Sequence, residues 1–492
     1  MRRRVFLNVG RAFVGLLLCQ HASALGQLPP VPVPTENPIT EQKRILGKIL
    51  FWDEQLSSND LVACGTCHIP ASGGADPRLG QHPGPDGIFG TQDDVLGSPG
   101  VPRADANNQP VEDPLFGFGS QVTGRSAQSF LMSAYAADLF WDGRASTVFA
   151  DPLDESSVII AAGGGLESQA VGPILSDVEM AHEQRDWEDV AVKLATVTPL
   201  AYASNLPTDV AAALASTITY PELFEAAFFT TEINPVRIGM AIATYERTLI
   251  PDQTPWDLFM AGDSDAMTPQ QIRGWNMFQN NTVCDNCHVP PQFTDHLFHN
   301  IGLRPARDDV GRMGTTGIPD DVGRFKTPSL RNVGLKASMM HVGWVTDVQD
   351  AIHFYNAPSF PEVDEETGHT QYTADQSGIP TAGGGTVPYS NINMPEETEG
   401  GVPMQVPIID FIVNALADPR VAAETFPFDR PTLRSERSAD LDGDGDVNAA
   451  DLAQLLSAWG PYELCPPFLP EDLDQDCSVG AFDLAVLLGN WG

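Results

Sequence analysis

Apolar side chains fall on one face of a helix that is predicted to begin near Thr40. Thr40 stands at the N-cap position, and Ile45, Leu46, Ile49 and Leu50 follow at helical spacing. This helix leads into a short segment that contains two cysteines.

A second stretch of the chain repeats this order. Thr268 fits the N-cap position, Pro269 fits the first turn, and Ile272, Trp275 and Phe278 line one helix face. Two more cysteines follow this helix. The repetition predicts two similar modules.

Elsewhere the pattern favours helices, with little of the alternation that is typical of strands. Helices are expected within residues 189–206 and 221–249. Residues 73–119 and 368–398 are rich in Gly, Pro and Asp, and they predict surface insertions. The fold class is therefore mainly α, and a chain of 492 residues is expected to form two or three domains.

The first residues have the features of a cleaved secretory signal. Four arginines precede or flank an apolar run over residues 12–19, and small residues follow at 22–24. The run is too short to cross a bilayer. We therefore expect a signal peptide over residues 1–24, a Pro-rich extended linker over 25–39, and a periplasmic or extracellular protein without a membrane span.

Acidic residues dominate the charge of the chain. The formal net charge is -38, and part of the excess lies in the C-terminal tail. Such a surface repels nucleic acid and anionic lipid, and it favours basic partners or bound cations.

The strongest chemical signal is the order Cys-X-X-Cys-His, which occurs twice. It comprises Cys64, Cys67 and His68 in the first module, and Cys284, Cys287 and His288 in the second. In such a motif two thiols add to the haem vinyl groups, and the histidine is the proximal ligand of the iron. A redox dithiol or half of a zinc site would not require the adjacent histidine twice. Two covalent haems of the c type are the predicted cofactors.

Further segments of the chain resemble the bacterial di-haem cytochrome c peroxidase and MauG family. The similar segments are residues 139–145, 169–173, 179–180, 245–250 and 327–333, together with the second haem motif. They occur in the family's order, and the resemblance spans roughly residues 40–420.

The resemblance implies roles for three residues near the first haem. Gln169 and Glu179 would line its distal side, where a carboxylate can take a proton from hydrogen peroxide and return it to the departing oxygen. Trp141 would lie between the haems and relay electrons. Calcium between the domains is a further family feature, although the residues at these positions, Ser126, Lys336 and Ser338, differ from the family pattern.

Two positions depart from the typical peroxidase. Residues 117–119 read Gly-Phe-Gly where many members carry Gly-His-Gly, whose histidine closes the first haem. The first haem is therefore expected to be open, unless His82 substitutes as a ligand. At the second haem, Tyr355 aligns with the sixth ligand, as in the MauG branch; the competing ligands are Met339, Met340, Met394 and Met404.

The acidic tail contains two Asp-spaced repeats that resemble dockerin type I calcium loops. The expected calcium ligands are Asp440, Asp442, Asp444, Asp446 and Asp451 in the first repeat, and Asp472, Asp474, Asp476, Ser478 and Asp483 in the second. Apolar residues Leu452, Leu455 and Leu456 predict a helix after the first loop. Cys465 and Cys477 are expected to form a disulfide, and a cohesin-like protein is the expected partner of this module.

These features predict two cytochrome c-like haem domains followed by a small EF-hand-like (dockerin-type) calcium-binding module. The expected boundaries are residues 40–255 for the peroxidatic domain, 256–425 for the electron-transfer domain and 438–492 for the module. The expected activity is the reduction of hydrogen peroxide to water with electrons from a small donor protein such as cytochrome c. The alternatives are a MauG-like oxidase acting on a protein side chain, a non-catalytic di-haem electron carrier, and a scaffold-attached binding protein.

Overall fold

The computed structural model describes residues 26–216, 219–282, 284–356, 359–363, 370–373, 398–399, 402–403, 405–436, 441, 447–461, 471, 473 and 478–489. The signal segment, Cys465, Cys477, Met394 and Met404 lie outside these residues.

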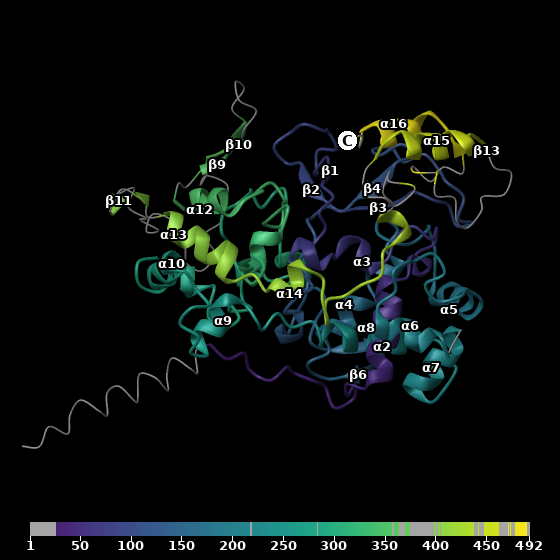
Figure 1. Cartoon of the computed structure of the whole chain (residues 1–492), viewed down its shortest axis with the longest axis horizontal. Coiled ribbons are helices and arrows are strands. Elements are labelled where there is room, and N and C mark those ends of the chain that lie inside the picture. Colours follow the sequence, from purple (N-terminus) through teal and green to yellow (C-terminus); the bar gives the residue numbers. More distant parts are fainter. Residues whose placement is uncertain are drawn as a thin grey trace, which may run out of the picture.

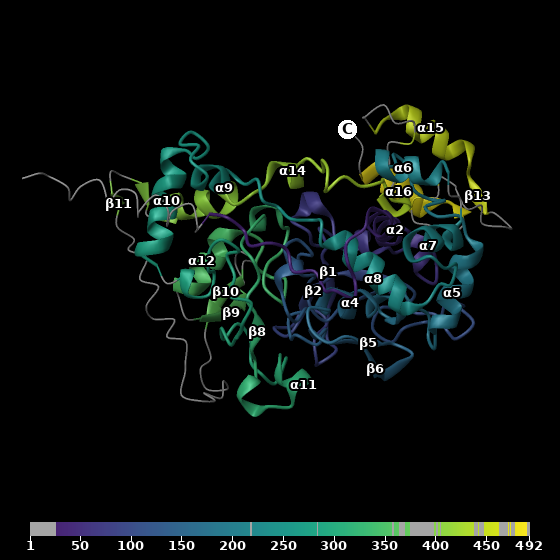
Figure 2. The same cartoon turned by 90° about the horizontal axis from the view of Figure 1, so that it is seen from below.

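Two helical lobes lie side by side, joined by the segment that carries α14 (Figure 1, Figure 2). The first lobe contains α2 (Glu41–Trp52), α3 (Cys64–Cys67), β1 (Gly80–His82), β2 (Val95–Gly97), β3 (Pro99–Pro102), β4 (Ser120–Val122), β5 (Phe149–Asp151), β6 (Asp154–Ile160), α4 (Gly165–Ala170), α5 (Trp187–Thr196), α6 (Thr208–Leu214), α7 (Tyr220–Phe228) and α8 (Pro235–Glu246).

The second lobe begins with α9. It contains α9 (Pro255–Met260), α10 (Pro269–Asn280), β7 (Phe298–His299), α11 (Met313–Thr316), β8 (Phe325–Lys326), α12 (Val348–Asn356), β9 (Ser359–Val363), β10 (Thr370–Thr373), β11 (Thr398–Glu399), β12 (Val402–Pro403), α13 (Gln405–Asp410) and α14 (Pro419–Ala422). The described strands form short antiparallel pairs between neighbours in sequence.

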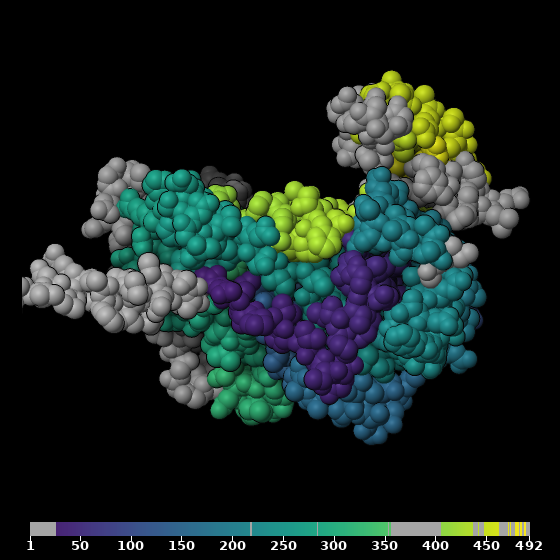
Figure 3. Space-filling model, turned by 60° about the horizontal axis from the view of Figure 1, so that its bottom comes forward, coloured from purple at the N-terminus to yellow at the C-terminus, as the bar shows by residue number. Residues whose placement is uncertain are grey.

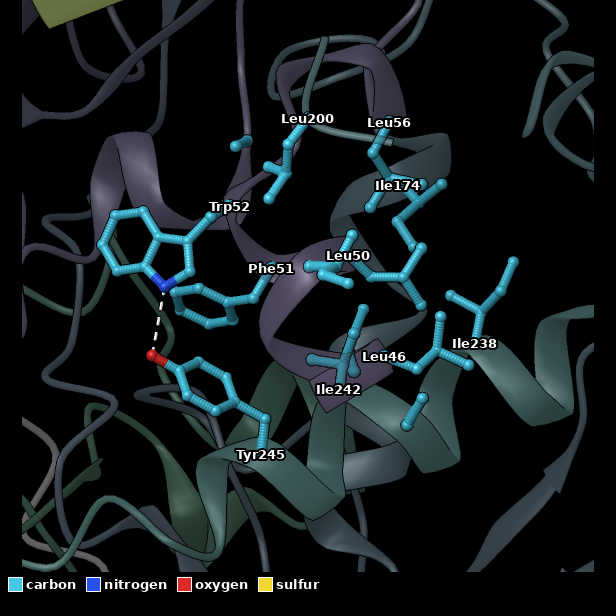
Figure 4. Packing of buried hydrophobic residues seen from close by; sticks show 14 of the residues in the cluster. Leu46, Leu50, Phe51, Trp52, Leu56, Ile174, Leu200, Ile238, Ile242 and Tyr245 are labelled. Atoms are coloured by element: carbon cyan, nitrogen blue, oxygen red, sulfur yellow. Dashed lines mark hydrogen bonds between the residues drawn. The ribbon is translucent and has the colours of Figure 1, made fainter. Parts of the chain in front are cut away.

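The core of the first lobe lies where α2 crosses α8. Leu46 and Leu50 of α2 pack with Ile238 and Ile242 of α8 (Figure 4). The two backbones are so close that a Cβ on Gly47 would meet the carbonyl oxygen of Ala241 at 1.9 Å. A larger residue than glycine would therefore separate these helices.

Capping explains where the main helices begin. Thr40 accepts a hydrogen bond from the backbone N–H of Lys43 at 3.3 Å, as the sequence predicts. At the predicted start of α10, Thr268 and Gln271 form a reciprocal capping box. α10 packs against α13 around Trp275 and Phe411, which form the core of the second lobe.

The predicted helical regions are interrupted where the apolar pattern alone shows no break. Residues 221–249 form α7 and α8, because Phe229 ends α7 at a φ of 60° and Asn234 caps a new helix at Pro235. Residues 189–206 are helical only as far as Thr196. The connecting segments turn the chain so that α8 can lie against α2.

The C-terminal side of the second lobe returns to the first. Val421, Phe428 and Leu433 are fully or almost fully buried within the core of the first lobe. The carboxylate of Glu54 accepts hydrogen bonds from the backbone N–H groups of Arg434 and Ser435, each at 2.8 Å. The first lobe is thus completed by residues from both ends of the haem-binding region.

The Pro-rich N-terminal segment follows the surface across both lobes (Figure 3). It begins beside Met260 of α9, where a Cβ on Gly26 would meet Met260 Cβ at 2.1 Å. The backbone oxygen of Pro29 accepts a hydrogen bond from Tyr135 at 2.9 Å. No helix or strand precedes α2 among residues 26–40, and the segment contains a turn in which the Asn37 N–H donates to the Pro34 oxygen at 3.1 Å.

Charged side chains connect the two lobes at their interface. Arg125 contacts Asp142 at 2.6 Å in its own lobe and Asp309 at 2.7 Å in the second lobe. The backbone N–H of Lys326 donates to the carbonyl oxygen of Trp141 at 2.8 Å. These contacts fix the lobes relative to each other around Trp141.

In the tail, α15 (Ala449–Ser457) and α16 (Ala481–Gly489) pack together, and β13 (Gly460–Pro461) pairs with β14 (Ser478–Val479). Leu455 is buried between them and Leu452 is partly buried, but Leu456 is 50% exposed, so the predicted apolar face is narrower than expected. Across the described ranges of the chain, no helix combines the length and apolarity that crossing a bilayer requires.

Candidate active site

A cavity of about 590 Å³ in the first lobe brings together residues that are far apart in the sequence. Its walls include Cys64, Cys67, His68, Trp141, Gln169 and Glu179, and also His82, Arg144 and Glu246. Every residue predicted at the first haem therefore faces one space.

The first cysteine motif forms α3, and its shape depends on small and polar residues. A Cβ on Gly65 would meet the ring of Trp52 at 2.1 Å, so the motif packs directly on that ring. Thr66 Oγ1 accepts from the backbone N–H of Ala63 at 2.9 Å and closes the turn. Trp52 is held in turn by a hydrogen bond to Tyr245 at 3.0 Å (Figure 4).

His68 is oriented by its Nδ1 atom, which lies 3.2 Å from the carbonyl oxygen of Gly74. Burial lowers the pKa of His68, so the ring is neutral. A neutral imidazole that donates from Nδ1 to a carbonyl presents a lone pair on Nε2, which is the form that binds a metal.

The second motif has the same local design. Cys284 begins a short 3₁₀ turn, and the backbone N–H of His288 donates to the carbonyl oxygen of Cys284 at 2.8 Å. His288 Nδ1 lies 3.1 Å from the carbonyl oxygen of Phe293. His68 and His288 are therefore oriented in the same way in the two lobes.

The donor sets fit haem better than zinc. In the part of the chain that the structure describes, one group of three metal-ligating side chains lies within reach of a single ion: Cys287, Asp295 and His299. It includes neither His288 nor Cys284, and Cys64 and Cys67 belong to no such group. Desolvation raises the pKa of the Cys64 thiol to about 12, which disfavours the thiolate that zinc requires. Paired thiols beside an oriented histidine match covalent haem attachment.

Glu179 lies in the cavity with a carboxyl group that retains its proton more readily than an exposed acid. Burial raises the pKa of Glu179, although Ser176 and the charge of Arg144 oppose the effect. Gln169, near the end of α4, lines the same cavity. An acid of raised pKa in a cavity that also holds a polar amide can exchange protons with a small substrate.

Trp141 occupies a tight turn that faces the second lobe. Its neighbours Phe140 and Gly143 have φ values of 64° and 74°, and its indole N–H donates to the carbonyl oxygen of Ser126 at 2.8 Å. The indole is 5% exposed and lies 6.2 Å, centroid to centroid, from the ring of His341. Trp141 thus borders both the cavity and the other lobe.

The residues aligned with the family's interdomain calcium site make other contacts. The Ser126 carbonyl oxygen accepts the Trp141 indole, and its hydroxyl donates to the carbonyl oxygen of Met340 at 2.6 Å. Desolvation lowers the pKa of the Lys336 ammonium to about 8. Ser338 is buried.

Tyr355 lies near the end of α12 and packs against Phe354, with ring centroids 5.2 Å apart. Burial raises the pKa of its phenol, with smaller contributions from Cys284 and Cys287. The phenol is therefore within electrostatic range of both cysteines of the second motif. Met339 is buried in the core of the second lobe, and Met340 packs against that core.

The segment aligned with the family's closing histidine lies away from the cavity. Phe118 is 66% exposed and does not line the cavity, whereas His82 does. Residues 73–119 were expected to be a surface insertion, but His82 of β1 and Ser98, just before β3, help to enclose the site.

One cavity residue was not singled out from the sequence as a site residue. Glu246, the last residue of α8, is 4% exposed, and its Oε2 atom has no hydrogen-bond partner among the residues that the structure describes. Burial raises its pKa to about 8, so the group is a neutral acid at pH 7. Its place inside the family-like segment 245–250 was the only signal available in the sequence.

The predicted calcium ligands of the tail are described only in part: Asp440, Asp442, Asp444, Asp446, Asp472, Asp474 and Asp476 lie outside the described residues. The last acids of the two loops have equivalent contacts. Asp451 accepts from the backbone N–H groups of Leu441 and Asn448 at 2.6 and 2.7 Å. Asp483 accepts from those of Leu473 and Gly480 at 2.5 and 2.6 Å.

Comparison with known proteins places these features in one family. The model for di-haem cytochrome c peroxidase matches residues 41–265. The methylamine utilization protein MauG of Methylophilus methylotrophus is 30% identical over 334 residues, which cover 66% of this chain and 76% of that protein. The cytochrome c551 peroxidase of Pseudomonas aeruginosa is 28% identical over 346 residues, covering 68% and 78%. The chain belongs to the di-haem cytochrome c peroxidase and MauG family, and it is an oxidoreductase of the di-haem peroxidase type.

Solved structures show the same fold. A MauG-like protein associated with microbial copper homeostasis aligns with a TM-score of 0.53 at 20% identity, covering 82% of this chain and 96% of that chain. The di-haem peroxidase BthA of Burkholderia thailandensis aligns with a TM-score of 0.50 at 23% identity, covering 81% and 91%. The mainly helical fold predicted from the sequence is confirmed.

Proposed function

We propose that the chain reduces hydrogen peroxide to water in the cavity beside His68, with electrons from a small redox protein. The net reaction consumes two electrons and two protons for each peroxide and yields two waters. The observation that carries this proposal is the presence of Glu179, an acid of raised pKa, in the same cavity as Cys64, Cys67 and His68.

Each haem would be held by its own lobe. Cys64, Cys67 and His68 would hold the first, whose iron supplies the peroxide-binding and electron-transfer chemistry, and Cys284, Cys287 and His288 would hold the second, which supplies a site for electron entry. The domain boundaries proposed for them are residues 40–255 and 256–425.

The protein's own residues would manage protons and orientation. Glu179 would accept a proton from one oxygen of the bound peroxide and return it to the other oxygen, which leaves as water. Gln169 would orient the substrate by hydrogen bonding. Trp141, in contact with the second lobe through His341, would provide the aromatic path between the two centres.

Turnover measured with hydrogen peroxide and reduced cytochrome c tests this function. A rate that depends on both reactants and is lost in Glu179→Gln supports it. Two six-coordinate haems with no peroxide reaction would instead identify an electron carrier.

A MauG-like oxidase is the second candidate, and Tyr355 is the observation that favours it. Its phenol is partly buried and lies near both cysteines of the second motif, so it would be available as a ligand of the second haem. An anionic phenolate favours ferric iron and lowers the potential of the second haem, which makes cytochrome c a poorer donor.

We also propose that residues 1–24 direct export and that residues 438–492 bind calcium as a dockerin-like module with a cohesin-like partner. The matching contacts of Asp451 and Asp483 support two loops of the same structure. Each carboxylate is buried and accepts a hydrogen bond from a backbone N–H of its own loop.

A further inference from the structure

His82 lies at the end of β1, in the insertion that was expected to be a surface loop. Its ring lines the same cavity as His68 and Glu179. A Cβ on Gly124, which also lines the cavity, would meet His82 Nε2 at 3.9 Å and no other atom within 4 Å. Nε2 is therefore the ring atom that faces this wall of the cavity.

The hydrogen bond of the other ring nitrogen determines what Nε2 can do. Nδ1 accepts a hydrogen bond from the backbone N–H of Gly84 at 3.1 Å. A neutral imidazole has one accepting nitrogen and one donating nitrogen, so the proton lies on Nε2. A protonated Nε2 has no lone pair for iron, and His82 therefore enters the cavity as a donor rather than as a ligand.

The surroundings hold the ring in this orientation and keep it neutral. Phe116 packs against it with ring centroids 6.0 Å apart. Asp94 and Arg304 are the charged groups near the ring, and their opposite effects on its pKa are smaller than that of burial, which lowers it. The neutral donor form is thus the stable one near pH 7.

The wall that carries His82 is continuous with the segment that carries Glu179. β1 lies against Val122 of β4, where a Cβ on Gly80 would meet that side chain at 2.8 Å. β3 and β4 in turn form hydrogen bonds with the segment that precedes Glu179. The Val101 N–H of β3 donates to the Val178 oxygen at 3.0 Å. The Gln121 side-chain amide of β4 donates to the Asp177 oxygen at 2.7 Å. His82 and Glu179 are therefore held by one connected unit.

We propose that His82 is a substrate-binding residue of the first-haem cavity, donating a hydrogen bond from Nε2 to a small anion or peroxide oxygen held there. It assists the leaving oxygen without transferring its own proton, and it acts beside the acid-base group Glu179. This role rests on the proposed peroxidase function only for the identity of the substrate, because any iron-bound anion that accepts a hydrogen bond would use the same donor.

Two substitutions separate the nitrogens of the ring. His82→Asn places an amide oxygen near the position of Nδ1, retains the Gly84 contact and deletes the Nε2 donor. His82→Gln places an amide N–H near the position of Nε2. Phe118→Leu, an exposed change in the same insertion, is the matched control.

The probe is sodium fluoride, titrated into the full-length ferric holoprotein and followed by visible spectra and electron paramagnetic resonance, with haem content measured in each sample. We expect His82→Asn to weaken fluoride binding about tenfold or more, and His82→Gln and Phe118→Leu to stay within about threefold of the wild type. The first haem should be high-spin in all four proteins before fluoride is added.

Equal fluoride affinity in His82→Asn and the wild type would overturn the proposal, as would a wild-type protein that binds no fluoride. A low-spin first haem that becomes high-spin in His82→Asn would identify His82 as an iron ligand instead. If the fluoride pattern holds but the wild type does not turn over peroxide, the donor role stands and the peroxidase function fails.

Discussion

Trp141 and His341 occupy equivalent positions in the two lobes and touch each other across the interface. Each follows a residue with positive φ, Phe140 at 64° and Met340 at 62°, and lies two residues before a glycine with a φ of 74°. Their rings meet edge to face at 6.2 Å. Burial lowers the pKa of His341 to about 3, so this contact joins two neutral rings. Such a pairing marks an approximate twofold relationship between the lobes.

Covalent haem at both motifs is the first prediction. Replacing Cys64 and Cys67 with alanine should leave one covalent haem in the chain, as should replacing Cys284 and Cys287, because each pair serves its own lobe. Mass spectrometry after acid-acetone extraction measures this. Complete loss of haem from the wild type in that extraction would contradict the assignment.

Glu179→Gln should slow peroxide reduction by about two to four orders of magnitude, the usual range for losing a positioned acid-base group. Haem content should be unchanged, because Glu179 does not belong to either cysteine motif. Steady-state rates with peroxide measure the effect, and Gln169→Ala should be milder. An unchanged rate would remove Glu179 from the mechanism.

Glu246 should make stability depend on pH. Its pKa rises from 4.5 to about 8 on folding, so between these values the unfolded chain loses a proton that the folded chain keeps. The free energy of unfolding should therefore fall as the pH rises through this window. Glu246→Gln should remove this dependence and gain about 1 to 3 kcal/mol over the wild type at pH 9, but little at pH 5.

Denaturant unfolding at both pH values tests the role of Glu246. Glu155→Gln, an exposed change on β6, is the control and should follow the wild type. If the free energy of unfolding changes equally with pH in the wild type and in Glu246→Gln, the carboxyl group is not desolvated in the folded protein.

Tyr355→Phe should abolish the low-spin signal of the second haem and raise its potential, because it removes an anionic oxygen ligand. Electron paramagnetic resonance and a redox titration measure the two effects. An unaltered spectrum, or a near-infrared sulfur-to-iron band in the wild type, would indicate a methionine ligand and an ordinary peroxidase.

Deleting residues 438–492 should abolish tight calcium uptake and leave peroxide turnover unchanged. The expected ligands of both loops lie in the deleted segment, whereas the contacts of Glu54 with Arg434 and Ser435 remain. Calorimetry on the full chain and on the deletion variant measures the uptake. Equal uptake by both would place the calcium elsewhere in the protein.

The sequence predicted the elements whose signals are local. Thr40 and Thr268 mark helix starts through their own hydrogen bonds, and the cysteine motifs carry their chemistry within five residues. Gln169 and Glu179, which the family-like segments singled out, both line one cavity. In these cases neighbouring residues determine the structure with little help from distant parts of the chain.

Most features that escaped prediction depend on tertiary contacts. The sequence offered His82 as a possible ligand of the first haem, but the Gly and Pro content around it describes only the local backbone and did not indicate that β1 helps to enclose the cavity. The break between α7 and α8 did carry a local signal, Asn234 as the cap and Pro235 in the first turn, which the expectation of helix over residues 221–249 did not use. Phe428 is buried in the first lobe although the whole second lobe separates it from that lobe in the sequence, so no local pattern could predict its burial.

The burial of Val421, Phe428 and Leu433 in the first lobe has a consequence for how the protein is made. A ribosome finishes α2 and α8 long before it reaches these residues, so the growing first lobe lacks part of its core while the second is synthesised. The first lobe can therefore complete its core only after the chain has been synthesised as far as Leu433. Folding of the first lobe thus depends on translation of nearly all of the second.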